Sequence, residues 1–349
     1  MVLVFGATGY TGRMVVQDLV ARGVPVRIAG RSQERLERLA SKHDGLEWVV
    51  ADVEDPESVA RAAAGSDVLV TTVGPYTWWG HVAADAALEH GIPYIDVTGE
   101  PGWLSKVFNE YGPRAEQAGV AMLPAIGYDY VPGNLAGALA LEAAGGVARS
   151  IDIGYFLTGR NPRTEQSFSK GTLQSLEASS DAMQFAFQHG EIVEERGARR
   201  KIEFQLEDRA ATAVSIGSTE HYWLPALYPE LRDVNAGLGW FEPGSTPADE
   251  PATSDEGGPN EDARAQARTN VIAVARDSEG AEISRVRLDG PNPYDLTGGI
   301  VGWTAQAAVA GELKGSGALG PVAAFGLERL RAACDEIGLR EVAQQSQSD

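Results

Sequence analysis

The sequence is poor in several features that mark particular classes of protein. It contains a single cysteine, Cys334, so no disulfide bond can form within the chain. It has no run near the roughly 20 consecutive apolar residues that a membrane-spanning helix requires, and its first five residues lack the basic start of a signal peptide. Its 29 lysines and arginines face 49 acidic residues, and the net charge of −20 repels phosphate backbones. We therefore expect a cytoplasmic protein with no nucleic-acid partner and no integral membrane segment.

Two common catalytic patterns are also missing. None of the ten tyrosines is followed four residues later by a lysine, so the Tyr-x-x-x-Lys pair of short-chain dehydrogenases is absent. The five histidines form no His-x-x-x-His pair, and there is no cysteine cluster, so we predict no metal site.

The first third of the chain alternates short apolar runs with segments of helical periodicity. Continuously apolar, β-branched runs are typical of strands that helices cover on both faces. The fold class is therefore α/β, with an N-terminal doubly wound parallel Rossmann sheet over residues 1–131. We expect strands at Val2–Phe5, Val26–Ala29, Trp48–Val53, Val68–Val73, Tyr94–Val97 and Val120–Leu123, and helices at Arg13–Arg22, Gln33–Lys42, Pro56–Ala64, His81–His90 and Leu104–Ala118.

After Pro132 the pattern changes, and we predict a second, α+β domain over residues 132–300 with a mixed or antiparallel sheet. Residues 241–262 hold seven acidic side chains, four prolines and no basic residue, which predicts a mobile surface loop at 241–264. Residues 301–343 are predicted to form C-terminal helices that pack back on the first domain. The second domain is expected to have a helix at Asn134–Ala144, strands at Ile151–Leu157, Ile202–Leu206, Thr269–Arg276 and Ile283–Leu288, and a hairpin turn at Glu279-Gly280; helical patterns follow at Leu296–Leu313 and Pro321–Gly338.

A glycine-rich turn joins the first strand to the first helix. Gly6 allows a tight turn, Gly9 lets the backbone approach a phosphate, and Gly12 lets the helix pack closely on the strand. The helix N-terminus adds unpaired N–H donors, so the turn predicts a dinucleotide site, with a purely structural turn as the alternative. The predicted cofactor-binding residues here are Gly6, Ala7, Thr8, Gly9, Tyr10, Thr11 and Gly12.

The end of the second strand indicates which dinucleotide is bound. NAD-selective sites carry an acidic residue here, whereas this chain has Arg31 and Ser32. A guanidinium binds a 2′-phosphate in bidentate fashion, so we predict NADP as the cofactor. Asp52 and Val53 follow the third strand and are placed to meet the adenine ring, although an aspartate there is as often a turn or helix-cap residue.

Three further motifs follow later strands: Thr72–Tyr76 (TVGPY), Tyr94–Glu100 (YIDVTGE) and Gly127–Pro132 (GYDYVP). With the glycine turn and Ala29–Ser32, they make the chain resemble the saccharopine dehydrogenase-like oxidoreductases, in particular the short branch similar to trans-acting enoyl reductase. Residues Asp129–Asn134 depart from the usual family pattern.

The resemblance implies that Val73, Gly74, Pro75 and Tyr76 lie along the nicotinamide ribose and that Gly99 and Glu100 line the cofactor groove. Glu100 is then either an acceptor for a ribose hydroxyl or a carboxylate at the start of the next helix.

Hydride transfer needs little from the protein beyond orientation, one proton and exclusion of water. The candidate proton donors are Tyr76, Tyr128, Asp129 and Tyr130, and Lys170 is a further candidate. Trp78 and Trp79 either form an apolar wall for an acyl substrate or seal the interface between domains.

These features predict an NADPH-dependent reductase of a small-molecule substrate, acting on an activated C=C of an apolar or acyl compound. The alternatives are an imine or amino-acid reductase of the saccharopine type and a non-catalytic NADP-binding regulator. An exposed sheet in the second domain would make a homodimer possible.

Overall fold

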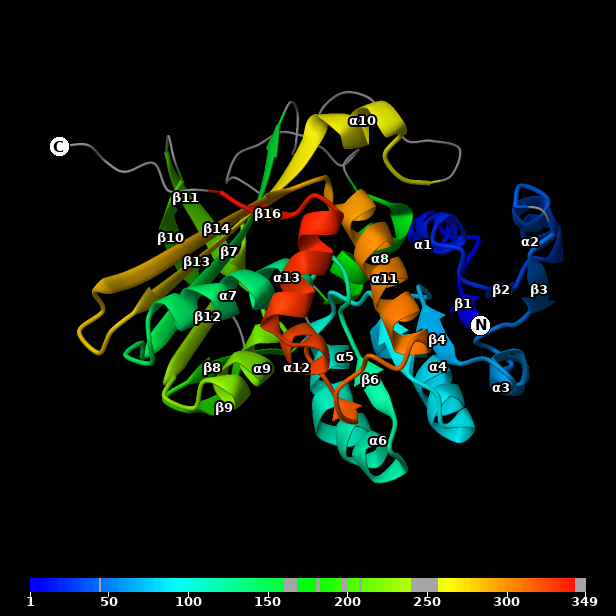
Figure 1. The fold of residues 1–349 in the computed structure, drawn as a ribbon, viewed down its shortest axis with the longest axis horizontal. Coiled ribbons are helices and arrows are strands. Elements are labelled where there is room, and N and C mark those ends of the chain that lie inside the picture. The colour runs from blue at the N-terminus through cyan, green and yellow to red at the C-terminus, as the bar shows by residue number, and fades with distance from the viewer. Residues whose placement is uncertain are drawn as a thin grey trace.

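The computed structural model describes residues 1–43, 45–159, 168–179, 183–195, 200–206, 209–239 and 257–342. Two sheets divide the described chain. A parallel sheet with its helices fills the right-hand half of Figure 1, a larger mixed sheet fills the left, and helices α7, α11 and α13 lie between them. The predicted α/β class is confirmed.

The parallel sheet has the strand order β15-β6-β5-β4-β1-β2-β3, in which β1 lies at the point where the order reverses. Residues alternate between two cores along β1: Val2 and Val4 face one, and Leu3 and Phe5 face the other. This explains the continuously apolar strands, because both faces are buried. The described strands of this sheet are β1 (Val2–Phe5), β2 (Val26–Gly30), β3 (Glu47–Val50), β4 (Val68–Thr71), β5 (Tyr94–Asp96), β6 (Ala121–Leu123) and β15 (Gly317–Ala318). All six predicted strands are confirmed.

Helices cover both faces of this sheet. The third, α3, begins where Asp55 accepts a hydrogen bond from the Ser58 amide, with Pro56 in the first turn, as the sequence predicts. The helix expected at His81 begins five residues earlier, so Trp78 and Trp79 lie in a helix rather than in a loop. The helices are α1 (Tyr10–Ala21), α2 (Gln33–Ala40), α3 (Pro56–Ala63), α4 (Tyr76–His90), α5 (Pro101–Lys106) and α6 (Gly112–Ala118), with a π-helical turn η1 (Val107–Tyr111) between the last two.

The second sheet is mixed, with the order β10-β11-β12-β7-β13-β14-β16 and a β8–β9 hairpin attached to β12. The four predicted strands are confirmed as β7, β10, β13 and β14. The others were missed because their sequences are not continuously apolar; β12 contains Asn235 and Gly237 yet pairs with both β7 and β11. The strands are β7 (Ser150–Gly159), β8 (Gln184–Gln188), β9 (Glu191–Glu195), β10 (Lys201–Gln205), β11 (Ala210–Ser215), β12 (Asp233–Leu238), β13 (Ala267–Arg276), β14 (Glu282–Gly290) and β16 (Arg340–Glu341).

Two helices cross the boundaries predicted for the acidic loop and the C-terminal helices. Residues 240–256 lie outside the described chain, but the expected loop end is ordered, because helix α10 occupies Glu261–Gln266. The boundary expected at residue 300 falls inside α11 (Pro293–Val309), which packs along α1. The remaining helices are α7 (Val131–Ala143), α8 (Lys170–Ser179), α9 (Glu220–Leu227), α12 (Pro321–Phe325) and α13 (Leu327–Glu336).

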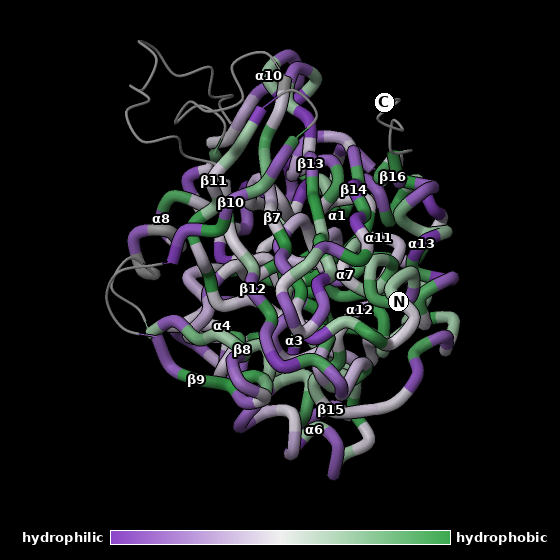
Figure 2. The backbone as a smooth tube through the Cα atoms, turned by 90° about the vertical axis from the view of Figure 1, so that its left-hand side faces the viewer, coloured by the Kyte–Doolittle hydropathy of each residue, from purple (hydrophilic) through white to green (hydrophobic). Residues whose placement is uncertain are grey.

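One large core joins the two sheets. It takes in Val4 of the parallel sheet, Leu135 of α7 and Val271 of the mixed sheet. In Figure 2 the hydrophobic segments gather in the middle of the molecule around α7, α11 and α12. The two sheets are therefore held together by buried apolar side chains as well as by the chain connections.

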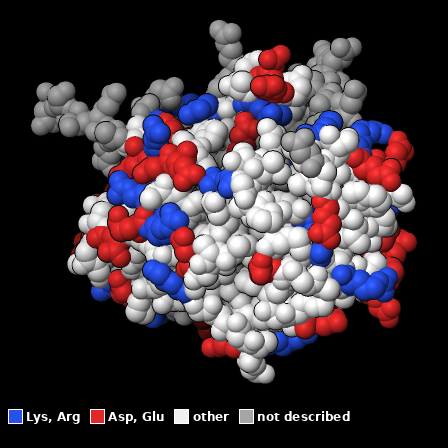
Figure 3. Space-filling model, turned by 45° about the vertical axis from the view of Figure 1, so that its right-hand side comes forward, with Lys and Arg blue, Asp and Glu red and all other residues white. Residues whose placement is uncertain are grey.

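Charged side chains surround a broad uncharged band on the face shown in Figure 3. Acidic and basic groups alternate around its margins, so the net negative charge forms no single patch on this face. Within the described residues, no helix has the length and hydropathy needed to cross a membrane.

Candidate functional site

The glycine-rich turn has the close backbone packing that a dinucleotide cradle requires. Gly6 has a φ of +88°, in the region that favours glycine, and a Cβ there would lie 2.7 Å from Thr72 Oγ1. A Cβ on Gly12 would lie 2.9 Å from the Cα of Ala7. Gly9 caps α1 without a side chain, so the first amides of the helix stay available to an anion. The turn therefore fits a pyrophosphate.

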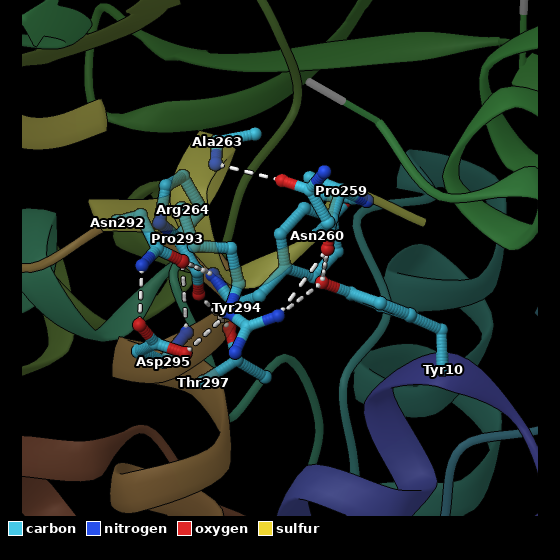
Figure 4. Close-up of polar contacts among 10 residues, drawn as sticks. All are labelled: Tyr10, Pro259, Asn260, Ala263, Arg264, Asn292, Pro293, Tyr294, Asp295 and Thr297. Atoms are coloured by element: carbon cyan, nitrogen blue, oxygen red, sulfur yellow. Dashed lines mark hydrogen bonds and ion pairs between the residues drawn. The ribbon is translucent and has the colours of Figure 1, made fainter. Parts of the chain in front are cut away.

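A segment from the second half of the chain lies across this turn (Figure 4). Tyr10 donates a hydrogen bond to the carbonyl oxygen of Pro259, and Arg264 Nη1 donates to the Tyr10 hydroxyl at 3.0 Å. The Tyr10 ring also packs edge-on against Tyr294 of α11, with 5.0 Å between centroids. Arg264 reaches Asp295 at 2.9 Å as well. We call this set of contacts the Tyr10 clamp.

Guanidinium groups gather beside the turn where the adenosine end of a dinucleotide would lie. Arg31 follows β2 and is exposed, and Ser32 caps α2 by accepting from the Arg35 amide at 3.4 Å. Arg35 Nη2 donates to the Thr8 carbonyl oxygen at 2.6 Å, and Arg13 Nη1 donates to the same oxygen at 3.0 Å. Sequence reasoning missed Arg35, although its place in the first turn of α2 was the available signal.

Asp52 has a local structural role. Its Oδ1 accepts from the Glu54 amide at 3.2 Å, and its own amide donates to Ser58 Oγ at 3.0 Å. Of the two predicted roles, the turn residue is the one these contacts support. Val53 beside it is half-buried, against the apolar core on that face of the sheet.

The Gly74-Pro75-Tyr76 turn is held by a buried carboxylate from the next strand. Glu100 accepts from the amides of Tyr76 and Thr77, each at 2.8 Å, from Thr77 Oγ1 at 2.8 Å and from Ser175 Oγ of α8 at 2.7 Å. Its carboxylate therefore caps α4, while Glu100 is itself the N-cap residue of α5, the helix start that one of the two predicted alternatives named. The four donors and the 1% exposure favour a role for Glu100 in positioning the turn over the predicted contact with ribose.

The Tyr76 ring packs in the core beside Gly74 of the same turn. Its phenol is buried and donates to the Thr71 carbonyl oxygen at 3.1 Å. Burial and the nearby Asp96 carboxylate raise its pKa well above the ordinary value. These contacts favour a structural role for Tyr76 over its predicted role as a proton donor. Trp78, in the first turn of α4, is 59% exposed, and Val73 is half-buried.

Asp129 is the candidate donor with the most unusual surroundings. It lies between β6 and α7, and its Oδ1 atom is buried with no hydrogen-bond partner among the described residues. Its other oxygen faces Gly99 so closely that a Cβ there would lie 3.0 Å from Oδ2. Burial, followed by the charge of Glu220, raises the pKa of Asp129 to about 7. Such a carboxyl is still about half protonated at pH 7.

A second buried acid, Glu220, was not predicted. It opens α9 and accepts a hydrogen bond from the Tyr155 hydroxyl of β7. That hydroxyl in turn accepts from the Gly133 amide at 2.9 Å, in the first turn of α7. Burial raises the pKa of Glu220 to about 7. No spacing in the sequence links it to Asp129.

The other predicted donors differ in their placement. The rings of Tyr128 and Tyr130 both pack edge-on against Tyr155, with centroid distances of 5.5 and 5.8 Å. Tyr130 donates to the Gly99 carbonyl oxygen at 3.3 Å. Lys170 lies exposed at the start of α8, with its side chain beside Gly257. The charge that raises the pKa of Asp129 is that of Glu220 and not that of Lys170. The geometry therefore favours Asp129 over Lys170.

The chain contains no metal-ligand cluster in its described part: no three His, Cys, Asp or Glu residues there come together as a metal site.

Comparison with known proteins places this geometry in a family context. A family described as NAD(P)H-binding matches residues 6–99, which confirms a NAD(P)H-binding unit around the glycine turn. The chain is 28% identical over 191 residues to the human saccharopine dehydrogenase-like oxidoreductase, covering 50% of this chain and 44% of that protein. The predicted resemblance to the saccharopine dehydrogenase-like oxidoreductases is confirmed.

A second curated relative has a more specific name. The chain is 34% identical over 140 residues to the trans-acting enoyl reductase of Mycobacterium bovis (strain BCG / Pasteur 1173P2), covering 38% of this chain and 34% of that protein. The chain thus matches less than half the length of each of these relatives.

One solved structure matches across both sheets. Apo histidine-tagged saccharopine dehydrogenase (L-Glu forming) from Saccharomyces cerevisiae superposes with a TM-score of 0.62 at 14% identity, covering 98% of this chain and 99% of that one. At this identity the likeness concerns the fold alone.

Proposed function

We propose that this protein is an NADPH-dependent reductase that acts on an activated C=C of an apolar acyl substrate, with Asp129 as the proton donor. The observation behind the proposal is the buried Asp129 Oδ1, which has no hydrogen-bond partner among the described residues. It lies in a loop at the carboxyl edge of the parallel sheet. Ligands of open α/β sheets bind at that edge. The name of the mycobacterial relative favours an enoyl substrate.

The bound cofactor would supply the hydride, and the protein supplies the proton. That hydride would add to the carbon remote from the acyl carbonyl, with the electron pair of the C=C moving toward the carbonyl. Asp129 then gives its proton to the carbon next to the carbonyl, which yields the saturated acyl compound, and the carboxylate regains a proton from water. A pKa near 7 suits such a donor at neutral pH.

Exposed apolar groups near the turn support an apolar substrate. Trp78 of α4 is 59% exposed and Leu173 of α8 is 41% exposed, and the bond from Ser175 to Glu100 holds α8 against the start of α4. An amino-dicarboxylate would need cationic anchors, whereas carboxyl and phenol groups surround Asp129.

We assign NADP as the cofactor on the basis of Arg31 and Arg35. Arg31 is exposed beside the cradle, and Arg35 already contacts the Thr8 carbonyl oxygen, so both can reach a 2′-phosphate. A thermal-shift titration with NADPH, NADP, NADH and NAD tests this. We expect a larger shift with NADPH than with NADH, and Arg31→Ala should remove the difference. An equal shift with NADH would show that Arg31 does not select between the two cofactors.

The reaction is tested by following NADPH absorbance with an enoyl thioester and with a cyclic imine. Consumption with the enoyl thioester supports the proposal. Consumption with the imine alone would favour the second candidate, a saccharopine-type imine reductase, which the name of the human relative suggests. Cofactor binding without turnover of either would favour a regulator. Cytoplasmic location, a homodimer and the domain division at residues 131 and 300 stay predictions.

A further inference from the structure

A segment that leads into the mixed sheet packs against the glycine-rich turn of the parallel sheet. It comprises Gly257–Gln266, which ends where β13 begins, and we call it the strap. The backbone of the strap meets the Tyr10 ring so closely that a Cβ on Gly258 would lie 2.6 Å from Tyr10 Cδ2. In Figure 4 the Tyr10 side chain extends from α1 toward Pro259 and Arg264 of the strap.

The strap is held in place at both of its ends. The Lys170 amide donates to the Gly257 carbonyl oxygen at 2.9 Å, which ties the start of the strap to α8. Asn260 Oδ1 accepts from the Ala263 amide at 2.9 Å and so begins α10. Beyond α10 the chain continues as β13, which pairs with both β7 and β14. Arg264 is therefore carried by a segment that a central strand of the mixed sheet anchors.

Arg264 joins the strap to the glycine-rich turn and to α11. Its Nη1 donates to the Tyr10 hydroxyl at 3.0 Å and to the Pro259 carbonyl oxygen at 3.2 Å, and its Nε donates to Asp295 Oδ1 at 2.9 Å. Because the Asp295 carboxylate balances the guanidinium charge, Arg264 offers the turn directed hydrogen bonds rather than a free positive charge.

Tyr10 is the residue through which the strap reaches the cofactor turn. It follows Gly9 and is the first residue of α1, so its amide is one of the helix-start donors that have no acceptor within the helix. Its ring lies between the strap and Tyr294 of α11, with 5.0 Å between the two ring centroids. Contacts that fix this ring also fix the start of the helix on which a pyrophosphate would rest.

We propose that the strap is part of the dinucleotide site and that Arg264, acting through Tyr10, is a positioning residue that holds the first turn of α1 for the cofactor pyrophosphate. NADPH and NADH share the pyrophosphate, so this role applies to either cofactor and to any substrate. By thermodynamic linkage, a bound cofactor must in turn stabilise the docked strap.

Fluorescence titration with NADPH and with NADH tests the positioning role. We expect Tyr10→Phe, which keeps the ring and removes the hydroxyl, and Arg264→Ala to weaken both cofactors by about fivefold or more, with the same factor for each. The double variant should bind about as weakly as either single variant, because both substitutions break one link. Unchanged affinities or additive losses would overturn the proposal.

Arg264→Lys distinguishes positioning from charge. Lysine keeps the positive charge but lacks the planar set of N–H groups that reaches Tyr10, Pro259 and Asp295 together. We therefore expect Arg264→Lys to remain weak in the same titration. Recovery of the wild-type affinity by lysine would show that charge alone matters and would overturn the positioning role.

Hydrogen exchange of the strap tests the linkage from the other direction. In the wild type, saturating NADPH should slow exchange of the backbone amides of residues 260–266, and in Tyr10→Phe this slowing should be reduced. Exchange in the strap that does not respond to NADPH would overturn the proposal. If the wild type binds NADH better than NADPH, the assignment of NADP fails, and the same two measurements made with NADH still decide the role of the strap.

Arg268→Ala is the matched control, because Arg268 is an exposed arginine of β13 that lies just beyond the strap. It should bind both cofactors as the wild type does. Urea denaturation of each variant shows that the affinities refer to folded protein. An Arg264→Ala variant that is less stable to urea but binds both cofactors normally would show that Arg264 only stabilises the fold, and that result would also overturn the proposal.

Discussion

Glu100→Gln tests whether one buried carboxylate organises the start of α4. Each Glu100 oxygen accepts two hydrogen bonds, and the amide nitrogen of glutamine would face two donors in place of one of those oxygens. Hydrogen bonds to a charged group contribute about 1.5–3 kcal/mol each, and the helix N-terminus adds up to about 2 kcal/mol. Because removing a buried charge also removes its desolvation cost, we expect a net loss of about 3 kcal/mol.

Differential scanning fluorimetry measures this change. A loss of this size in a chain this long should lower the melting temperature by about 5 °C. The affinity for NADPH should fall as well, because the Gly74-Pro75-Tyr76 turn and Ser175 lose their shared anchor. Glu116→Gln on α6 is the matched control and should melt with the wild type. A Glu100→Gln variant that melts with this control and binds NADPH normally would refute the capping role.

Three further outcomes follow from the site. Gly9→Asp places a carboxylate against the pyrophosphate position and should abolish the thermal shift caused by NADPH; unchanged affinity would contradict the placement of the cofactor. The pKa of Asp129 is raised by burial to about 7 in the folded state, so its contribution to the free energy of unfolding is largest below about pH 4 and is lost as the pH rises through about 7. Asp129→Asn should therefore be more stable than the wild type above pH 7, by about 4 kcal/mol at most, and urea denaturation that ranks the two proteins the other way would contradict it. Arg264→Ala removes the cation of the Tyr10 clamp and should weaken NADPH binding in a fluorescence titration, whereas Arg268→Ala, two residues beyond α10, should not.

The sequence predicted the parallel sheet well because its signals are local. The strand Val68–Thr71 is continuously apolar since both of its faces are buried, and Asp55-Pro56 marks a helix start within two residues. The glycine turn could be predicted from the sequence for the same reason. Its three glycines act on backbone atoms within a few residues of one another, apart from the approach of Gly6 to Thr72.

The roles of the acidic residues could not be predicted in the same way, because their partners are distant along the chain. Ser175 lies 75 residues from Glu100, and Tyr155 lies 65 residues from Glu220. Tyr76 is predicted as a proton donor from its position after a strand, but its hydroxyl donates to the Thr71 carbonyl oxygen at the end of β4. The Tyr10 clamp needs Arg264, 254 residues away. Tertiary contacts of this kind leave no spacing for a sequence pattern to detect.

The contrast between Glu100 and Asp129 separates a structural carboxylate from a chemical one. Both are acidic side chains at the carboxyl edge of the same sheet, and both have oxygens removed from water. Glu100 accepts four hydrogen bonds, two from the amides at the start of α4 and two from hydroxyl groups, so both of its oxygens stabilise the turn. Asp129 has one oxygen with no partner in the described chain and a second buried acid as its neighbour. Leaving a buried oxygen unpaired costs free energy, and folding tolerates this cost most readily where function requires it. That difference is the physical reason for assigning proton transfer to Asp129 and positioning to Glu100.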